Sequence, residues 1–186
     1  MILEILHVNG DNEDIQSRYH NGPEYQKFIA DLKSKILKAS QIGADIIYRP
    51  NLGDMTRKET EIYFTSKEDS KLRQPELKQK FPLLDGLAEV TFTLLPDGLY
   101  APTYVDESDQ MIANDPSKLV IIGGKYKQAC VAAVVKNTQS RNPTAQVLIG
   151  DDVSFENKFP PIEGYQSIPH TTLERHLILA PNPFYI

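Results

Sequence analysis

Apolar residues along the chain gather in short blocks, and most of these blocks have the length of a β-strand. Several are nearly continuous rather than alternating, which is typical of strands that are buried on both faces of a sheet. The predicted strands cover residues 1–8, 45–49, 87–94, 119–122 and 145–149. Residues 184–186 are expected to add a sixth strand at an edge.

Longer segments between these runs carry the helical period. In residues 23–44, apolar side chains recur every three to four positions with lysines opposite. Pro23 suits the first helical position and Gly43 suits the C-terminal cap. Further helices are predicted over residues 104–114 and 127–138.

Turn chemistry sets the remaining boundaries. Gly123 and Gly124 are expected to form a turn after the fourth strand, and Gly150 is expected to close the fifth. Thr171 and Glu174 have the spacing of a capping box, which predicts a short helix near the C-terminus.

Strands that alternate with helices predict an α/β fold of three layers, α/β/α, around a mainly parallel sheet of about six strands. We expect the strand order 3-2-1-4-5-6 and a single domain over residues 1–186. Residues 51–82 are polar and of mixed charge, and we interpret them as an insert or a lid. Ligands of such sheets bind beyond the carboxyl ends of the strands where the order reverses, which here lies between residues 7–11 and residues 124–130.

Composition narrows the classes of function. The net charge of −5 argues against nucleic acid as a partner, because phosphate binding needs a basic face. No apolar run has the length of a membrane span, and the N-terminus does not resemble a signal peptide. The single cysteine favours a reducing compartment, so the chain is expected to be cytoplasmic as synthesised, with export by a non-classical route left open.

Cys130 is the first candidate for chemistry. It lies at the start of the helix predicted after the fourth strand, where unpaired N–H groups and the helix dipole favour a thiolate. The alternative is a small buried hydrophobic residue without a chemical role.

The residues around Cys130 resemble those of the isochorismatase-like cysteine hydrolases, a superfamily that includes nicotinamidases and N-carbamoylsarcosine amidohydrolases. Residues 124–131, GKYKQACV, resemble the family pattern G-x-x-T-D-x-C-V. Residues 42–48 and 100–105 are similar to two further family elements, and the family's acid after the fifth strand corresponds to Asp151 or Asp152.

This resemblance implies a catalytic cysteine with an aspartate and a lysine. The cysteine is Cys130, but His7 stands at the aspartate position and Leu94 at the lysine position. The resemblance therefore implies a hydrolase of small amides or imides in which Cys130 is the nucleophile, His7 is the base, and the N–H groups of Ala129 and Cys130 bind the oxyanion. The substrate-binding residues that it implies are Asn9, Asp11, Tyr100, Tyr126, Lys127 and Ala129.

Other interpretations stay open for these residues. His7 could be a structural histidine, and Lys125 and Lys127 are expected to be solvated. His170 and His176 lack metal-ligand spacing, so we expect neither a metal nor a cofactor. Relatives commonly assemble, which implies a homo-oligomer. A catalytically inactive scaffold that binds a small molecule or a protein is the alternative function.

Overall fold

The computed structural model describes residues 1–8, 22–49, 83, 86, 87, 89–94, 107–156 and 160–179. Asn9, Asp11, Tyr100, the expected insert at residues 51–82 and the expected strand at residues 184–186 lie outside these ranges.

The strand order predicted from the sequence is confirmed. Among the described residues the sheet has six strands in the order β3-β2-β1-β4-β5-β6, and every neighbouring pair is parallel. The strands are β1 (Ile2–Leu6), β2 (Asp45–Arg49), β3 (Phe92–Leu94), β4 (Val120–Lys125), β5 (Val147–Phe155) and β6 (His170–Thr171). The sixth strand therefore comes from a segment that was predicted as the approach to a helix, and β3 is shorter than expected.

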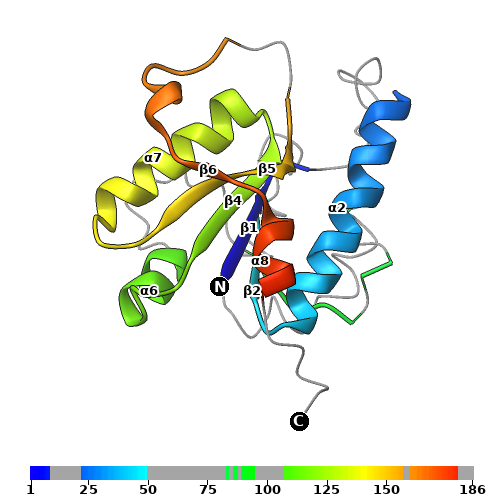
Figure 1. The fold of residues 1–186 in the computed structure, drawn as a ribbon, viewed down its shortest axis with the longest axis horizontal. Coiled ribbons are helices and arrows are strands. Elements are labelled where there is room, and N and C mark those ends of the chain that lie inside the picture. The colour runs from blue at the N-terminus through cyan, green and yellow to red at the C-terminus, as the bar shows by residue number, and fades with distance from the viewer. Residues whose placement is uncertain are drawn as a thin grey trace, which may run out of the picture.

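Helices cover both faces of the sheet, which confirms the three-layer α/β/α class. Helices α2 (Pro23–Gln41) and α8 (Leu173–Leu179) lie on one side in Figure 1. The other side carries α6 (Glu107–Asn114), the π-helical turn η2 (Lys127–Val131) and α7 (Ala132–Arg141). A short 3-10 helix, η3 (Tyr165–Ser167), precedes β6.

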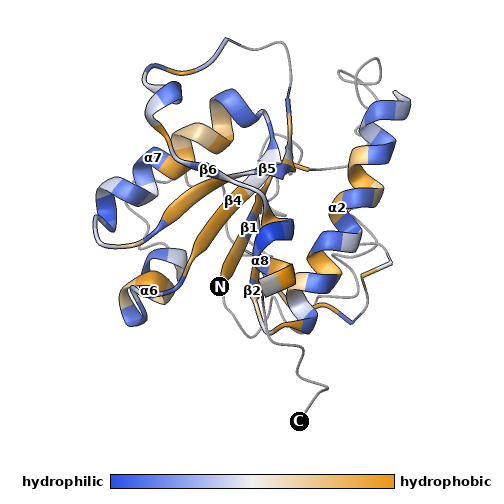
Figure 2. Cartoon of the chain, viewed as in Figure 1, coloured by the Kyte–Doolittle hydropathy of each residue, from blue (hydrophilic) through white to orange (hydrophobic). Residues whose placement is uncertain are grey.

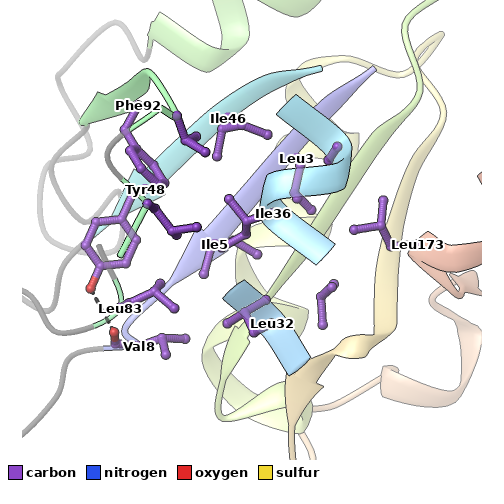
Figure 3. Close-up of a cluster of buried hydrophobic side chains, with 14 of the residues drawn as sticks. Leu3, Ile5, Val8, Leu32, Ile36, Ile46, Tyr48, Leu83, Phe92 and Leu173 are labelled. Atoms are coloured by element: carbon purple, nitrogen blue, oxygen red, sulfur yellow. Dashed lines mark hydrogen bonds between the residues drawn. The ribbon is translucent and has the colours of Figure 1, made fainter. Parts of the chain in front are cut away.

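The central strand β1 is buried on both faces and divides the core into two clusters. Leu3 and Ile5 pack with Leu32 and Ile36 of α2, as Figure 3 shows. Ile2 and Leu6 belong to the cluster that contains residues of α6 and α7. The strands are accordingly the most hydrophobic part of the chain in Figure 2, whereas the helices are hydrophobic on one side only.

One buried ion pair interrupts the apolar face of β1. Glu4 is fully buried and pairs with Nε of Arg49 at the end of β2. Nη2 of the same guanidinium donates to Oγ of Ser108 at 3.0 Å, which ties α6 to the sheet. Removing one partner from such a pair would leave an uncompensated buried charge. Because Arg49 also donates to Ser108, the ion pair and the position of α6 on the sheet depend on the same guanidinium group.

Two turns predicted at glycines are wrong. Gly123 and Gly124 lie inside β4, and β5 continues through Gly150 to Phe155. A Cβ atom on Gly123 would lie 2.5 Å from the carbonyl oxygen of Val153, and one on Gly124 would collide with the carbonyl oxygen of Leu6. These glycines are required by close approach between strands rather than by a reversal of the chain.

The helix near the C-terminus forms, but the predicted capping box is wrong. Thr171 lies in β6, and its Oγ1 is hydrogen-bonded to Nε2 of His176 at 2.9 Å. The carboxylate of Asp152 caps α8 instead, because it accepts the N–H of Leu173 at 2.6 Å and the N–H of Glu174 at 3.1 Å. The cap is therefore provided by β5, which a local spacing rule does not detect.

We predict that Gly124→Ala destabilises the fold by at least about 3 kcal/mol, because the new methyl group would collide with the backbone of Leu6 and the residue would keep a φ of +130°. Urea denaturation measures this loss. Gly43→Ala is the matched control, since Gly43 also has a positive φ (+79°) but has no atom within 4 Å of the place that a methyl group would take. The control should lose only about 1 kcal/mol. Equal losses would show that the contact between β1 and β4 is loose.

Candidate active site

The carboxyl ends of β1 and β4 lie side by side at the point where the strand order reverses. Leu6 pairs with Gly124, so His7 leaves β1 beside the last residue of β4 (Figure 1). His7 is 6% exposed and has a positive φ of 55°. Its N–H donates to the carbonyl oxygen of Arg49 at 2.8 Å, which keeps this end of β1 attached to β2. Strained backbone of this kind gathers at functional sites.

The turn after β4 holds Cys130. Tyr126 adopts the left-handed conformation (φ 66°, ψ 56°), and η2 begins directly after it. The carbonyl oxygen of Tyr126 accepts the N–H of Ala129 at 2.9 Å and that of Val131 at 3.3 Å. Cys130 is half-buried within this wide π-helical turn. Such turns are frequent at functional sites.

One expected oxyanion donor already has a partner. The N–H of Ala129 donates to Tyr126, so it could bind an oxyanion only after that hydrogen bond breaks. A preorganised oxyanion hole aims its donors at the reacting centre before the substrate arrives. This geometry is therefore less favourable for catalysis than the family pattern implied.

Lys127 was expected to be solvated, and this expectation is wrong. The residue is 9% exposed, and its Nζ lies 2.7 Å from Oδ1 of Asp151 and 3.1 Å from Oε1 of Glu156. Burial alone would lower the pKa of Lys127, but the hydrogen bonds to Asp151 and Glu156 outweigh it and raise the pKa. Lys127 therefore stays charged and fastens the start of η2 to β5.

Asp151 extends this network to β6. Its Oδ1 lies 2.8 Å from Nδ1 of His170, whose ring packs edge-on against Tyr165 with centroids 5.3 Å apart. Burial opposes the charged form of Asp151, but the hydrogen bonds from His170 and Lys127 outweigh it and hold the pKa of this carboxyl below its ordinary value. The N–H of Ile162 also donates to the carbonyl oxygen of Gln128 at 2.9 Å. The turn that carries Cys130 is thus held from two sides.

Lys125 was also expected to be solvated, and the structure buries it to 7% exposure. Its Nζ lies 4.9 Å from the ring centroid of Tyr126 and 5.8 Å from that of Tyr25. Burial lowers its pKa to about 8. The pKa values of the two lysines that flank Tyr126 are therefore shifted in opposite directions.

The described residues thus bring part of the predicted site to one edge of the sheet. The segments that carry His7, Tyr126, Lys127, Ala129 and Cys130 meet there. Asn9, Asp11 and Tyr100 lie outside the described ranges, as does the side chain of Leu94. Sequence reasoning missed the roles of Lys125, Glu156 and His170. Lys125 ends β4 and Glu156 directly follows β5, so the full length of these strands would have placed both residues at the edge. The sequence did not predict this length, because the glycines within the two strands were interpreted as turns.

Neither a metal cluster nor a membrane-spanning helix occurs in the part of the chain that the structure describes. No three His, Cys, Asp or Glu side chains within it are grouped closely enough to hold a metal ion. None of its helices combines the length and the apolar character that crossing a bilayer requires.

Solved structures share the α/β fold of this chain. The chain is similar to the N-carbamoylsarcosine amidase of Thermoplasma acidophilum, with 13% identity, a TM-score of 0.54 and coverage of 89% of this chain and 88% of that one. It is also similar to the MAR1 ribonuclease of Caenorhabditis elegans, with 10% identity, a TM-score of 0.56 and coverage of 95% and 79%. At these identities the likeness establishes the fold. No protein-family profile and no curated protein sequence matches the chain.

We predict that Asp151→Asn lowers the free energy of unfolding by about 1 kcal/mol at pH 7, a value kept small because 37% of this side chain is exposed. Because the folded-state pKa of Asp151 is depressed, its stabilising effect is present above the ordinary carboxyl pKa of about 3.9 and is lost as the pH falls through the folded-state value. The difference between wild type and variant should therefore shrink below about pH 4.

Denaturant titrations at several pH values measure this difference. Glu156→Gln is the matched control, since it removes the more exposed carboxylate, at 63%, from the same ammonium group. Its effect should be the smaller of the two. A larger loss for Glu156→Gln, or a loss for Asp151→Asn that does not depend on pH, would contradict the assignment of Asp151 as the main partner of Lys127.

Proposed function

We propose that this protein is a cysteine hydrolase of small amide- or imide-type C–N bonds. The observation that carries the proposal is the pairing of Leu6 with Gly124, since it sets the end of β1 beside the strand that leads into the Cys130 turn. The fold shared with an N-carbamoylsarcosine amidase supports the substrate class. The net charge of −5 favours a small molecule over RNA, although one neighbour is named as a ribonuclease.

In this proposal His7 accepts the thiol proton of Cys130 while the sulfur attacks the carbonyl carbon of the substrate. The tetrahedral intermediate collapses as the leaving nitrogen takes that proton, and a thioester with the enzyme remains. Water then attacks the thioester, His7 takes a proton from the water, and the acid product leaves with the thiol restored. In this mechanism His7 takes and returns each proton and Cys130 forms the covalent bond, so no cofactor is needed.

The oxyanion requires donors from the same turn. The N–H of Cys130 is one candidate, and that of Ala129 becomes available when its bond to the Tyr126 carbonyl oxygen opens. A hydrogen bond of this kind contributes about 1 kcal/mol net, which substrate binding can offset. The proposal therefore includes a small movement of the π-helical turn on binding.

A binding scaffold without catalysis is the second candidate. The occupied N–H of Ala129 favours it, because the turn as it stands satisfies its own hydrogen bonds. The replacement of the family's lysine by Leu94 favours it as well. Under either function a small-molecule ligand and a homo-oligomer stay predictions.

We predict that the purified protein releases ammonia or amine from a panel of N-carbamoyl amino acids, nicotinamide and cyclic imides. Cys130→Ala should reduce turnover to the uncatalysed background, because the nucleophile is lost. His7→Gln should reduce kcat/KM by at least about a hundredfold, the lower range for a positioned general base. Coupled ammonia detection and mass spectrometry of the acyl-enzyme measure both effects.

His176→Gln is the control for histidine replacement. His176 lies on α8 and is hydrogen-bonded to Thr171 of β6, so it has no place in the proposed mechanism. This variant should keep the wild-type rate. Turnover that survives Cys130→Ala would end the proposal. Saturable binding of a panel compound without turnover would establish the scaffold function instead.

A further inference from the structure

The hydroxyl group of Ser154 is a buried polar group without a partner. Ser154 lies in β5 and is 9% exposed. Within the part of the chain that the structure describes, its Oγ makes no hydrogen bond. A buried hydroxyl that gives up its hydrogen bonds to water without replacing them destabilises the folded state. Native proteins satisfy most of their buried polar groups, so this exception needs a physical reason.

The alternation of side chains along β5 sets the direction of this hydroxyl. Val153 belongs to the core cluster that contains residues of α2, and the ring of Phe155 packs against aromatic rings of α2. Successive residues of a strand point to opposite faces of the sheet, so Ser154 points to the other face. On that face Glu156 pairs with Lys127 of η2. The hydroxyl of Ser154 therefore faces η2.

The register of the sheet brings Ser154 to the turn that carries Cys130. Ser154 pairs with Gly124 of β4, and Tyr126 follows two residues later. The turn η2 packs against both β4 and β5. We call this turn closed while the N–H of Ala129 donates to the carbonyl oxygen of Tyr126, as it does in this structure, and open when that hydrogen bond is broken. The unused donor and the acceptor that closes the turn therefore lie at the same end of adjacent strands.

We propose that Ser154 is a positioning residue, which stabilises the open form of η2 by donating a hydrogen bond to the carbonyl oxygen of Tyr126. When Ala129 turns its N–H toward the oxyanion, this carbonyl oxygen loses a donor, and the hydroxyl of Ser154 replaces it. The inference rests on the proposed function and deepens it, because it gives the reason why the turn can open for a substrate.

The replacement of one donor by the other shifts the balance between the two forms. In the closed form the hydroxyl of Ser154 is buried without a partner, which raises the free energy of that form. In the open form the hydroxyl is hydrogen-bonded, so the cost of releasing the N–H of Ala129 falls. Ser154 therefore lowers the stability of the free protein and favours the form that binds the oxyanion. A residue of this kind exchanges stability for function.

The test compares Ser154→Ala with Ser154→Thr, which keeps a hydroxyl group at the same position. Removing the hydroxyl should raise the urea midpoint above that of the wild type, because the closed form no longer contains an unsatisfied group. The amide hydrogen exchange of Ala129, followed by NMR, should slow about fivefold, the factor that corresponds to one net hydrogen bond. Ser154→Thr should exchange at close to the wild-type rate.

Thr171→Val is the matched control, because Thr171 is also 9% exposed but its Oγ1 is hydrogen-bonded to His176. This variant should lower the urea midpoint and leave the exchange of Ala129 unchanged. An ordinary structural hydroxyl at position 154 would behave in the same way as Thr171. A midpoint that does not rise in Ser154→Ala, or an exchange rate of Ala129 that does not fall, would overturn the proposal.

The turnover assay gives a separate readout. Ser154→Ala should lower kcat/KM by about the same fivefold, and Ser154→Thr should restore it. A wild-type kcat/KM in Ser154→Ala would overturn the inference and leave the hydrolase intact. Absence of turnover in the wild type would contradict the hydrolase alone, since the exchange rate and the urea midpoint are measured on the free protein and still decide whether Ser154 stabilises the open turn.

Discussion

The close approach of β1 and β4 at Gly124 is the constraint on which the rest of the structure depends. No side chain fits between this residue and the carbonyl oxygen of Leu6, so only glycine lets the two strands pair to their ends. That pairing brings His7, the last residue of β4 and the Cys130 turn to one edge of the sheet. The chemistry proposed for this protein takes place at the edge that this contact creates.

The pKa values of the two lysines at this edge are shifted in opposite directions. The carboxylates of Asp151 and Glu156 keep Lys127 charged and fasten the turn, while burial lowers the pKa of Lys125. Farther from the edge, the buried pair of Glu4 and Arg49 holds α6 against the sheet, and the backbone of Arg49 holds His7. A rigid frame of this kind is what a positioned nucleophile and base require.

Hydrophobic runs were sufficient to predict most of the strands and the layers, because each buried strand is locally continuous in its apolar character. They failed where two strands meet. Gly123 and Gly124 have the local composition of a turn, but they are glycine because Val153 and Leu6 approach from other strands. Lys127 and the cap of α8 were similarly misjudged, since their partners lie on different elements. The geometry of the site therefore depends on contacts between residues that are distant in sequence, and local sequence patterns do not contain this information.

The most direct test of a coupled His7 and Cys130 is the pH dependence of Cys130 alkylation by iodoacetamide, which is unambiguous because the chain has one cysteine. If His7 serves Cys130 as a base, the wild type should react clearly faster than His7→Gln at pH 7, and the two rates should converge above about pH 9, where an ordinary thiol ionises without help. Rates that coincide at every pH would show that the imidazole and the sulfur do not act together, and would contradict the central claim.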